Sequence, residues 1–78
     1  MKWQDRITVD PQVCHGQACI KGSRVLVSLV LDNLAERETP EAIAAAYHIS
    51  VADVQAALEY AAELAKDRVV AFRGTSAA

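Results

Sequence analysis

Long apolar runs are missing from this sequence of 78 residues. No run approaches the roughly 18 apolar residues of a membrane-spanning helix. Lys2 is followed by Trp, Gln, Asp and Arg, where a signal peptide would continue with an apolar stretch. These absences predict a cytoplasmic chain with no membrane contact. Its two cysteines are then expected to stay reduced, because a cytoplasm keeps thiols reduced.

Groups for catalysis are also scarce. The chain has two histidines, His15 and His48, and it shows neither a Ser/His/Asp order nor a carboxylate pair set in an apolar pocket. So small a body also leaves little room for a cleft that excludes water. We therefore expect no enzymatic activity, no cofactor and no metal.

Aromatic residues make up 5% of the chain, although 53% of it is apolar and much of that share is alanine. A chain of this size hides only about 60% of its unfolded surface when it folds. Small domains often gain stability by binding a partner, so we expect a homodimer or a protein complex. The residues expected at such an interface are Trp3, Tyr60, Val69, Val70 and Phe72.

The charged residues are unevenly placed along the chain. The net charge is −2, yet residues 1–24 carry +2, residues 25–65 carry −6 and residues 66–78 carry +2. Contacts with phosphate would therefore come from the ends of the chain. The candidate DNA contacts are Arg6, Lys21, Arg24, Ser50 and Gln55. The alternative is an ordinary solvated surface of mixed charge.

Two helix starts lie eleven residues apart. Thr39 is suited to an N-cap with Pro40 in the first helical position, and Ser50 with Asp53 has the spacing of a capping box. A helix of about two turns, a tight turn and a longer helix over about 51–66 form the pattern of a helix-turn-helix unit. Any helical hairpin would share this pattern.

The second helix of this unit has poor chemistry for reading DNA. Gln55 is its one base-reading side chain, and no Arg or Asn is placed to make a bidentate contact with a base. Asp53, Glu59 and Glu63 would repel phosphates. The sequence therefore predicts the fold of a helix-turn-helix DNA-binding unit, but it does not predict the positive charge that the second helix of such a unit needs.

The rest of the chain predicts a single domain over residues 1–73. Residues 1–5 are expected to be loose, two short strands are expected at 7–9 and 18–20, and a helix capped by Ser28 is expected over 29–37. A short strand is expected at 69–72, followed by a disordered tail at 74–78. The buried stripe of the last helix is expected to contain Val54, Leu58, Ala61, Leu64 and Ala65.

The loop between the two strands holds two candidate sites. Cys14, His15 and Cys19 could ligate a metal, but a structural zinc site needs four ligands, and His48 could join them only if its turn folds beside this loop. We favour thiols packed as small apolar groups over a metal site or a disulfide.

The glycines of the same loop allow a second interpretation. Gly16, Gly22, Ser23 and Arg24 could cradle an anion. The structural alternative, which we favour, is that the glycines supply positive φ angles and that Arg24 pairs with a carboxylate such as Asp10.

Several segments together resemble one family, the small bacterial and archaeal domain of unknown function numbered 433. They are ITVDP from Ile7, VCHGQACIKGSRV from Val13, LDNLAE from Leu31, TPEAI from Thr39 and VQAALEY from Val54. His15, Ala18 and Ser23 depart from the family's Cys-Gly-Gly-x-Pro-x-Ile-x-Gly-Thr-Arg segment, and Arg37-Glu38 stands where the family usually has a glycine.

The resemblance implies a mainly α fold: a three-helix, homeodomain-like bundle preceded by a small β element, dimeric in solution. It also implies a VapB-like antitoxin that blocks a PIN-like RNase toxin and represses its own operon. Two alternatives stay open. One is a helix-turn-helix regulator without a toxin partner, and the other is a pure interaction module whose acidic helix docks on a basic protein.

Overall fold

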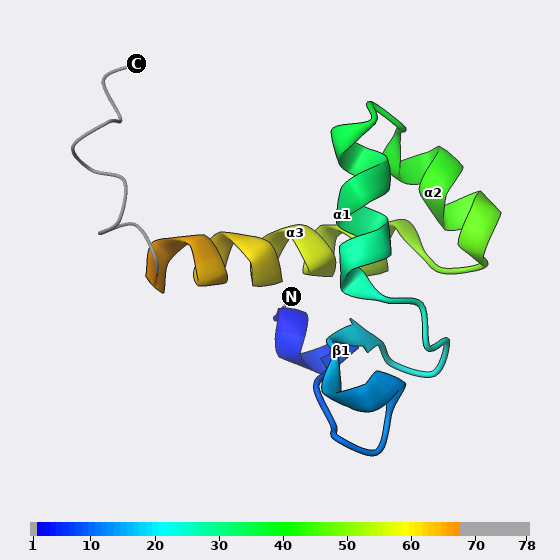
Figure 1. Cartoon of the computed structure of the whole chain (residues 1–78). Coiled ribbons are helices and arrows are strands. Elements are labelled where there is room, and N and C mark those ends of the chain that lie inside the picture. The colour runs from blue at the N-terminus through cyan, green and yellow to red at the C-terminus, as the bar shows by residue number, and fades with distance from the viewer. Residues whose placement is uncertain (1, 68–78) are drawn as a thin grey trace.

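The computed structural model describes residues 2–67 and shows a small helical bundle with a two-stranded N-terminal sheet (Figure 1). The fold class is thus as predicted. The elements in chain order are η1 (Trp3–Asp5), β1 (Ile7–Thr8), η2 (Cys14–Gly16), β2 (Cys19–Ile20), α1 (Val27–Ala35), α2 (Pro40–Tyr47) and α3 (Val51–Asp67). The strand expected at 69–72 and the tail at 74–78 lie outside the described residues.

The start of the chain is more ordered than predicted. Residues 3–5, which were expected to be loose, form the helical turn η1. Strands β1 and β2 pair antiparallel, with Ile7 opposite Ile20 and Thr8 opposite Cys19. Both isoleucines are almost fully buried, so this small sheet contributes to the core.

Helix α1 begins two residues earlier than predicted. Its N-cap residue is Leu26, which makes no side-chain capping bond, and Ser28 lies inside the helix. Leu26 bridges to Cys19, and the N–H of Val27 donates to the carbonyl of Ala18 at 3.0 Å. A backbone group of the β element therefore satisfies the helix start in place of a capping side chain.

The predicted caps of α2 and α3 are confirmed. The hydroxyl of Thr39 accepts from the N–H of Ala42 at 3.1 Å, and Pro40 is the first residue of α2. At α3 the N–H of Asp53 donates to the Ser50 hydroxyl at 3.1 Å, and the N–H of Ser50 donates to the Asp53 carboxylate at 3.0 Å. This is the reciprocal bonding of a capping box.

The core lies where the three helices meet the sheet. Its buried cluster contains Ile7, Ile20, Val27, Val30, Ile43, Val54, Ala56 and Ala57. Three of the five residues expected in the buried stripe of α3 are exposed: Leu58 (39%), Leu64 (42%) and Ala65. The contacts of α3 with its neighbours are made by small residues instead: Ala56 and Ala57 are fully buried, so the helix lies close against the rest of the core at these positions.

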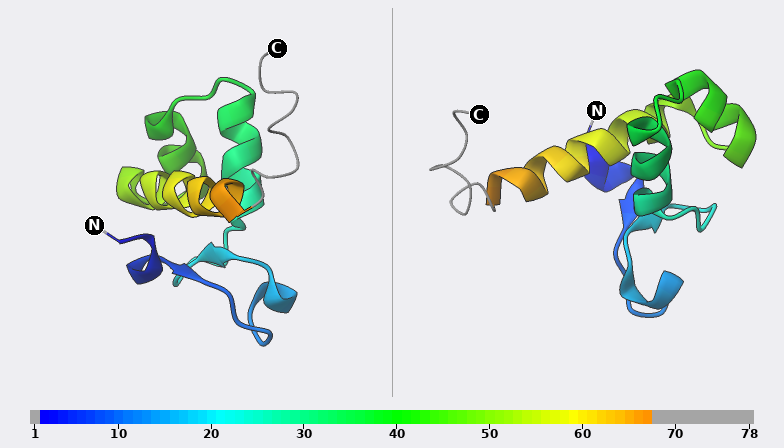
Figure 2. Two further views of the ribbon diagram at one scale, coloured as in Figure 1. Left: turned by 90° about the vertical axis from the view of Figure 1, so that its left-hand side faces the viewer. Right: turned by 45° about the horizontal axis from the view of Figure 1, so that its top comes forward.

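The second half of α3 extends beyond the other helices (Figures 1 and 2). Residues 62–66 are all exposed. Apolar residues keep their helical spacing as far as Ala65, but the last turns of α3 project into solvent. The spacing therefore predicts burial where the structure shows exposed side chains.

Candidate functional site

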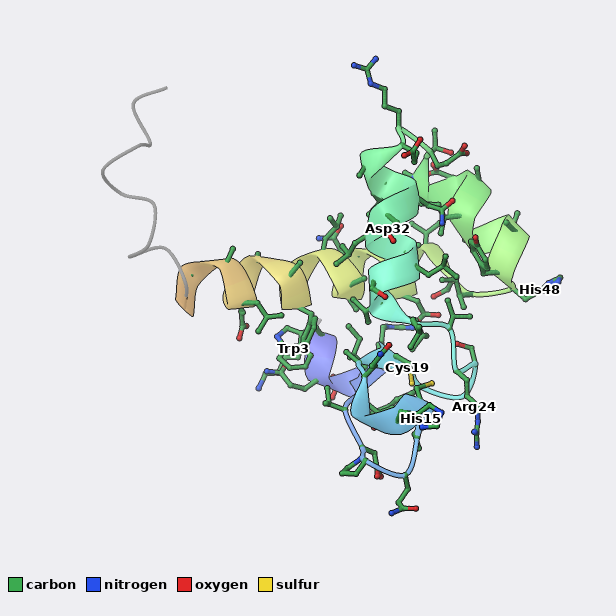
Figure 3. The ribbon with its side chains drawn as sticks, viewed as in Figure 1. Trp3, His15, Cys19, Arg24, Asp32 and His48 are labelled. Carbon is green, nitrogen blue, oxygen red and sulfur yellow. The ribbon has the colours of Figure 1, made fainter. Side chains whose placement is uncertain are left out.

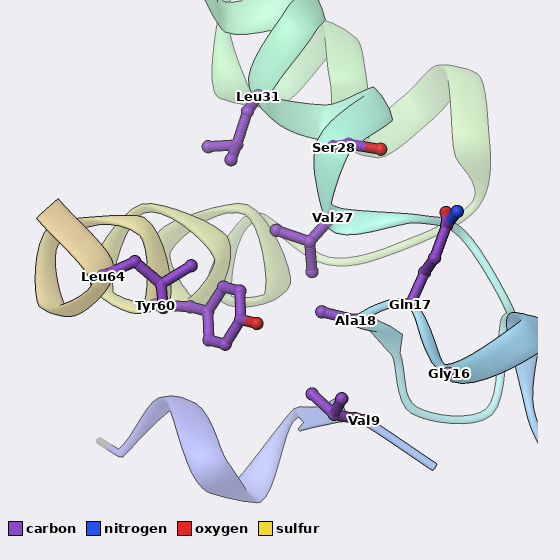
Figure 4. Close-up of a pocket in the computed structure, with 9 residues that line it drawn as sticks. All are labelled: Val9, Gly16, Gln17, Ala18, Val27, Ser28, Leu31, Tyr60 and Leu64. Atoms are coloured by element: carbon purple, nitrogen blue, oxygen red, sulfur yellow. The ribbon is translucent and has the colours of Figure 1, made fainter. Parts of the chain in front are cut away.

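An apolar groove of about 500 Å³ opens beside the projecting half of α3 (Figure 4). Three parts of the chain form it: residues 9–18 of the β element, the first turns of α1, and α3. Its lining residues are Val9, Gly16, Gln17, Ala18, Val27, Ser28, Leu31, Tyr60 and Leu64. None of these residues carries a formal charge, so the groove is suited to an apolar group and not to an ion.

The rim of the groove exposes large apolar side chains. Val9, directly after β1, is 53% exposed, and Leu64, near the end of α3, is 42% exposed. Leu31 on α1 and Tyr60 on α3 are half-buried between them. Burying such surface is favourable by about 25 cal/mol per Å² of apolar area, so an occupant would gain from contact with both rim and floor.

An aromatic pair supports the wall of the groove formed by α3. The rings of Trp3 and Tyr60 lie edge to face, with centroids 4.9 Å apart and an interplanar angle of 73°. The indole Nε1 of Trp3 is buried and has no hydrogen-bond partner in the described part of the chain. Of the expected interface residues, Tyr60 lines the groove and Trp3 packs against it, whereas Val69, Val70 and Phe72 lie outside the described residues.

Arg6 joins the β element to the start of α3. Its Nη1 lies 3.1 Å from the Asp53 carboxylate and 3.5 Å from the Ser50 hydroxyl. Burial alone would raise the pKa of Asp53, but hydrogen bonds from the Ser50 N–H, Arg6 and the Ser50 hydroxyl hold that pKa below its ordinary value. Two candidate DNA contacts, Arg6 and Ser50, thus form part of a capping network, while Gln55 is exposed on α3.

The other two candidate DNA contacts lie together in the β element. Lys21 and Arg24 are exposed and border a hollow of about 460 Å³ with Thr8, Val13, Cys19, Ile20 and Gly22. Gly16 and Gly22 have φ angles of 83° and 80°, which confirms their predicted structural role. Within residues 2–67 the expected ion pair between Arg24 and Asp10 is not formed; the Asp10 carboxylate accepts from the N–H of Gln12 at 2.8 Å.

The two cysteines are free thiols, as favoured from the sequence. Cys19 is buried, and the Cys14 thiol donates to the carbonyl of Arg24 at 3.6 Å. Burial raises the pKa of the Cys19 thiol, and so does the neighbouring Cys14.

His48 lies far from His15 and Cys19 (Figure 3). Among the described residues no group of three or more His, Cys, Asp or Glu side chains could hold a metal.

Comparison with family models gives one match. Residues 7–61 match the family described as Protein of unknown function (DUF433). The chain belongs to this family. The DUF433 match takes in both strands, α1, α2 and α3 as far as Ala61, so Leu64 at the rim of the groove lies beyond it. Neither the curated proteins nor the solved structures contain a match to this chain.

Sequence reasoning missed most of the groove. Val9 was expected inside a strand, and Leu64 was expected inside the buried stripe of α3. The signal that could have identified Leu64 is the length of α3, whose 17 residues outrun the nine of α1 and the eight of α2. A helix that is longer than its neighbours leaves its last turns uncovered.

No helix in residues 2–67 has the length and apolar character needed to cross a membrane.

Proposed function

We propose that this DUF433 protein is an antitoxin that binds and neutralises a PIN-like RNase toxin through the apolar groove. The observation that carries the binding half is the uncharged groove of about 500 Å³ with Val9 and Leu64 exposed at its rim. Contiguous exposed apolar surface of this kind is typical of protein interaction sites. The toxin as partner is what the family resemblance implies.

Co-expression with the product of the adjacent gene tests this function. We expect a stable complex and rescue of growth from a toxic neighbour. Leu64→Asp should weaken the complex by at least tenfold, because it places a charge on the apolar rim. The matched control is Leu29→Asp, since Leu29 is 37% exposed on α1 and does not line the groove. Lack of both a complex and growth rescue would refute the proposal.

Regulation of its own operon is the second candidate function. The α2–α3 unit supports it, and Arg6 offsets the negative charge of Asp53 at the start of α3. Lys21 and Arg24 would supply phosphate contacts. Binding to the upstream DNA of the gene should weaken steeply as salt rises, because phosphate contacts release counterions. A flat salt response would remove this function.

One substitution separates DNA binding from docking on a basic protein. Glu63 is exposed on α3. Glu63→Lys should raise the affinity for DNA by removing repulsion from phosphates, whereas it should lower the affinity for a basic protein surface. The sign of the change therefore distinguishes the operator function from the pure interaction module.

A further inference from the structure

The two cysteines of the β element are direct neighbours. The Cys14 thiol, in η2, is close enough to the Cys19 thiol, in β2, to interact with it and raise its pKa. In Figure 3 the sulfur atoms lie side by side, next to the Cys19 label. Cys14 also donates to the carbonyl of Arg24 at 3.6 Å, and the Arg24 N–H donates to the carbonyl of Ile20, the residue after Cys19. These contacts hold Cys14 against the strand that carries Cys19. We call these two residues the thiol pair.

The members of the thiol pair differ in access to solvent. Cys14 is half-buried, whereas Cys19 is only 1% exposed. Burial also raises the pKa of Cys19 and so keeps its proton in place. A small oxidant therefore reaches Cys14 first, and Cys19 lies where it can attack a sulfur that Cys14 has bound.

The loop that carries Cys14 has an unusual backbone. Cys14 and His15 both lie in the left-handed region, with φ angles of 52° and 56°, which residues with a Cβ rarely adopt and which is often found at functional sites. The backbone bonds of η2 are local: the N–H of Gly16 donates to Val13, and the N–H of Gln17 donates to Cys14. A shift of η2 toward β2 therefore leaves the pairing of β1 with β2 intact.

The approach to the thiol pair is positively charged. Lys21 and Arg24 are exposed and border the hollow of about 460 Å³ that Cys19 also lines. Among the residues that the structure describes, no Asp or Glu lines this hollow. A concave surface of one charge raises the local concentration of oppositely charged small molecules. The hollow therefore favours an anionic reagent over a neutral one.

The segment between the two thiols is also a wall of the groove. Gly16, Gln17 and Ala18 line the groove, and all three lie between Cys14 and Cys19 in the chain. A bond between the two sulfurs would close a ring around these three residues. The shape of this wall therefore depends on whether the thiols are free or joined.

We propose that the thiol pair is a site of reversible oxidation by anionic low-molecular-weight disulfides, and that the disulfide formed there reshapes the groove. The Cys14 thiolate attacks one sulfur of the reagent, forms a mixed disulfide and releases the first reagent thiol. Cys19 then gives up its proton and attacks the Cys14 sulfur, which releases the second reagent thiol. Two electrons and two protons pass from the pair to the reagent. The effect on the groove rests on the proposed function, whereas the oxidation itself does not.

Mass spectrometry of the full chain after treatment with oxidised glutathione tests the order of reaction. The native chain should lose two hydrogen atoms and keep no glutathione. Cys19→Ala should keep one glutathione at Cys14, because no second thiol can displace it. Cys14→Ser should stay unmodified while it is folded, because Cys19 is buried. Glutathione retained by the native chain, or equal modification of the two variants, would overturn the proposal.

The unsubstituted chain gives a test that does not depend on how the variants fold. In a glutathione redox buffer, the equilibrium constant for the internal disulfide should be about tenfold larger, or more, in the folded chain than in urea, because the fold holds the two thiols together. An equal or smaller constant in the folded chain would overturn the proposal.

Charge reversal tests the hollow as the approach. At low salt, Lys21→Glu should slow oxidation by oxidised glutathione about threefold or more, and it should leave oxidation by the neutral hydroxyethyl disulfide unchanged. The matched control is Lys66→Glu, which makes the same change of charge on α3, outside the hollow. Equal slowing by both variants would overturn this role of the hollow.

Binding of the adjacent gene's product tests the effect on the groove. The oxidised chain should bind about threefold more weakly, or less, than the reduced chain, because the preformed wall has moved. Cys14→Ser should bind equally well before and after treatment. An equal dissociation constant for both states of the native chain would overturn the effect on the groove. If neither state binds while the disulfide still forms, the proposed function fails and the oxidation site stands.

Discussion

The two halves of α3 belong to one helix and differ in what surrounds them. The first half starts in a capping box, is joined to the β element by Arg6 and buries Val54, Ala56 and Ala57 completely. The second half begins near Ala61 and leaves Leu64 exposed beside the groove. The first half thus holds the fold together, whereas the second half leaves apolar surface exposed.

The same kind of residue therefore has opposite effects in the two halves. Alanine in the first half allows helices to pack closely, as Ala57 shows with no exposed surface. Alanine in the second half lies at the surface and does not pack in the core, as the exposed Ala62 indicates. Composition alone cannot separate these roles, because both halves are rich in the same small apolar residue.

The largest expected effect comes from placing one charge in each half. Ala57→Asp should destabilise the fold by about 3 kcal/mol or more, because it buries a carboxylate without a partner. Ala62→Asp should change the stability of the monomer by less than about 0.5 kcal/mol, because the site is exposed. Urea unfolding at low protein concentration measures both. Similar losses of unfolding free energy in the two variants would show that the two halves of α3 do not differ in burial.

Much of the fold could be predicted because its signals are local. The side chains of Thr39 and Ser50 each bond to a backbone N–H three residues further along the chain. Such caps can be predicted from a few neighbouring residues. The turn at Gly22 is local in the same way. These features needed no knowledge of the rest of the chain.

The groove and the Arg6 link could not be predicted, because they depend on distant residues. Arg6 meets Asp53 across 47 positions of sequence, and nothing near Arg6 indicates that partner. The start of α1 is set by the carbonyl of Ala18 and not by Ser28. Leu64 is exposed because α3 is longer than the helices beside it. The apolar spacing of α3 alone carries no information about the length of its neighbours.

The second expected effect concerns the anchoring of the first half at Asp53. Asp53→Ala removes the capping acceptor and the contact with Arg6, and it should cost about 1–2 kcal/mol of unfolding free energy. The control is Glu63→Ala, which removes an exposed carboxylate from the second half and should cost less than about 0.5 kcal/mol. Thermal unfolding at pH 7 gives both values. Equal losses would show that the network does not anchor α3.

Acid should weaken the same anchor. The pKa of Asp53 is lower in the folded chain than its ordinary value, so the folded state favours the charged carboxylate. Its contribution is fully present above the unfolded pKa and is lost as pH falls below about 4. Asp53→Asn should flatten this part of the pH profile, as measured by urea unfolding at several pH values. An unchanged profile would assign the acid sensitivity to other groups.

The smallest expected effect sharpens the comparison by strengthening the anchored half. His48 ends α2 in the left-handed region, with φ of 58° and ψ of 41°, a conformation that costs a residue with a Cβ about 1–2 kcal/mol. Its N–H donates to the carbonyl of Ala44, so the turn into α3 requires this geometry. His48→Gly should therefore raise the unfolding free energy by about 0.5–1 kcal/mol, net of the greater freedom of glycine in the unfolded chain. His48→Ala, which keeps the Cβ, should give no gain in thermal unfolding. A gain confined to glycine would show that the left-handed backbone of His48 strains the turn before α3, and an equal gain in both variants would show that the imidazole and not the Cβ is responsible.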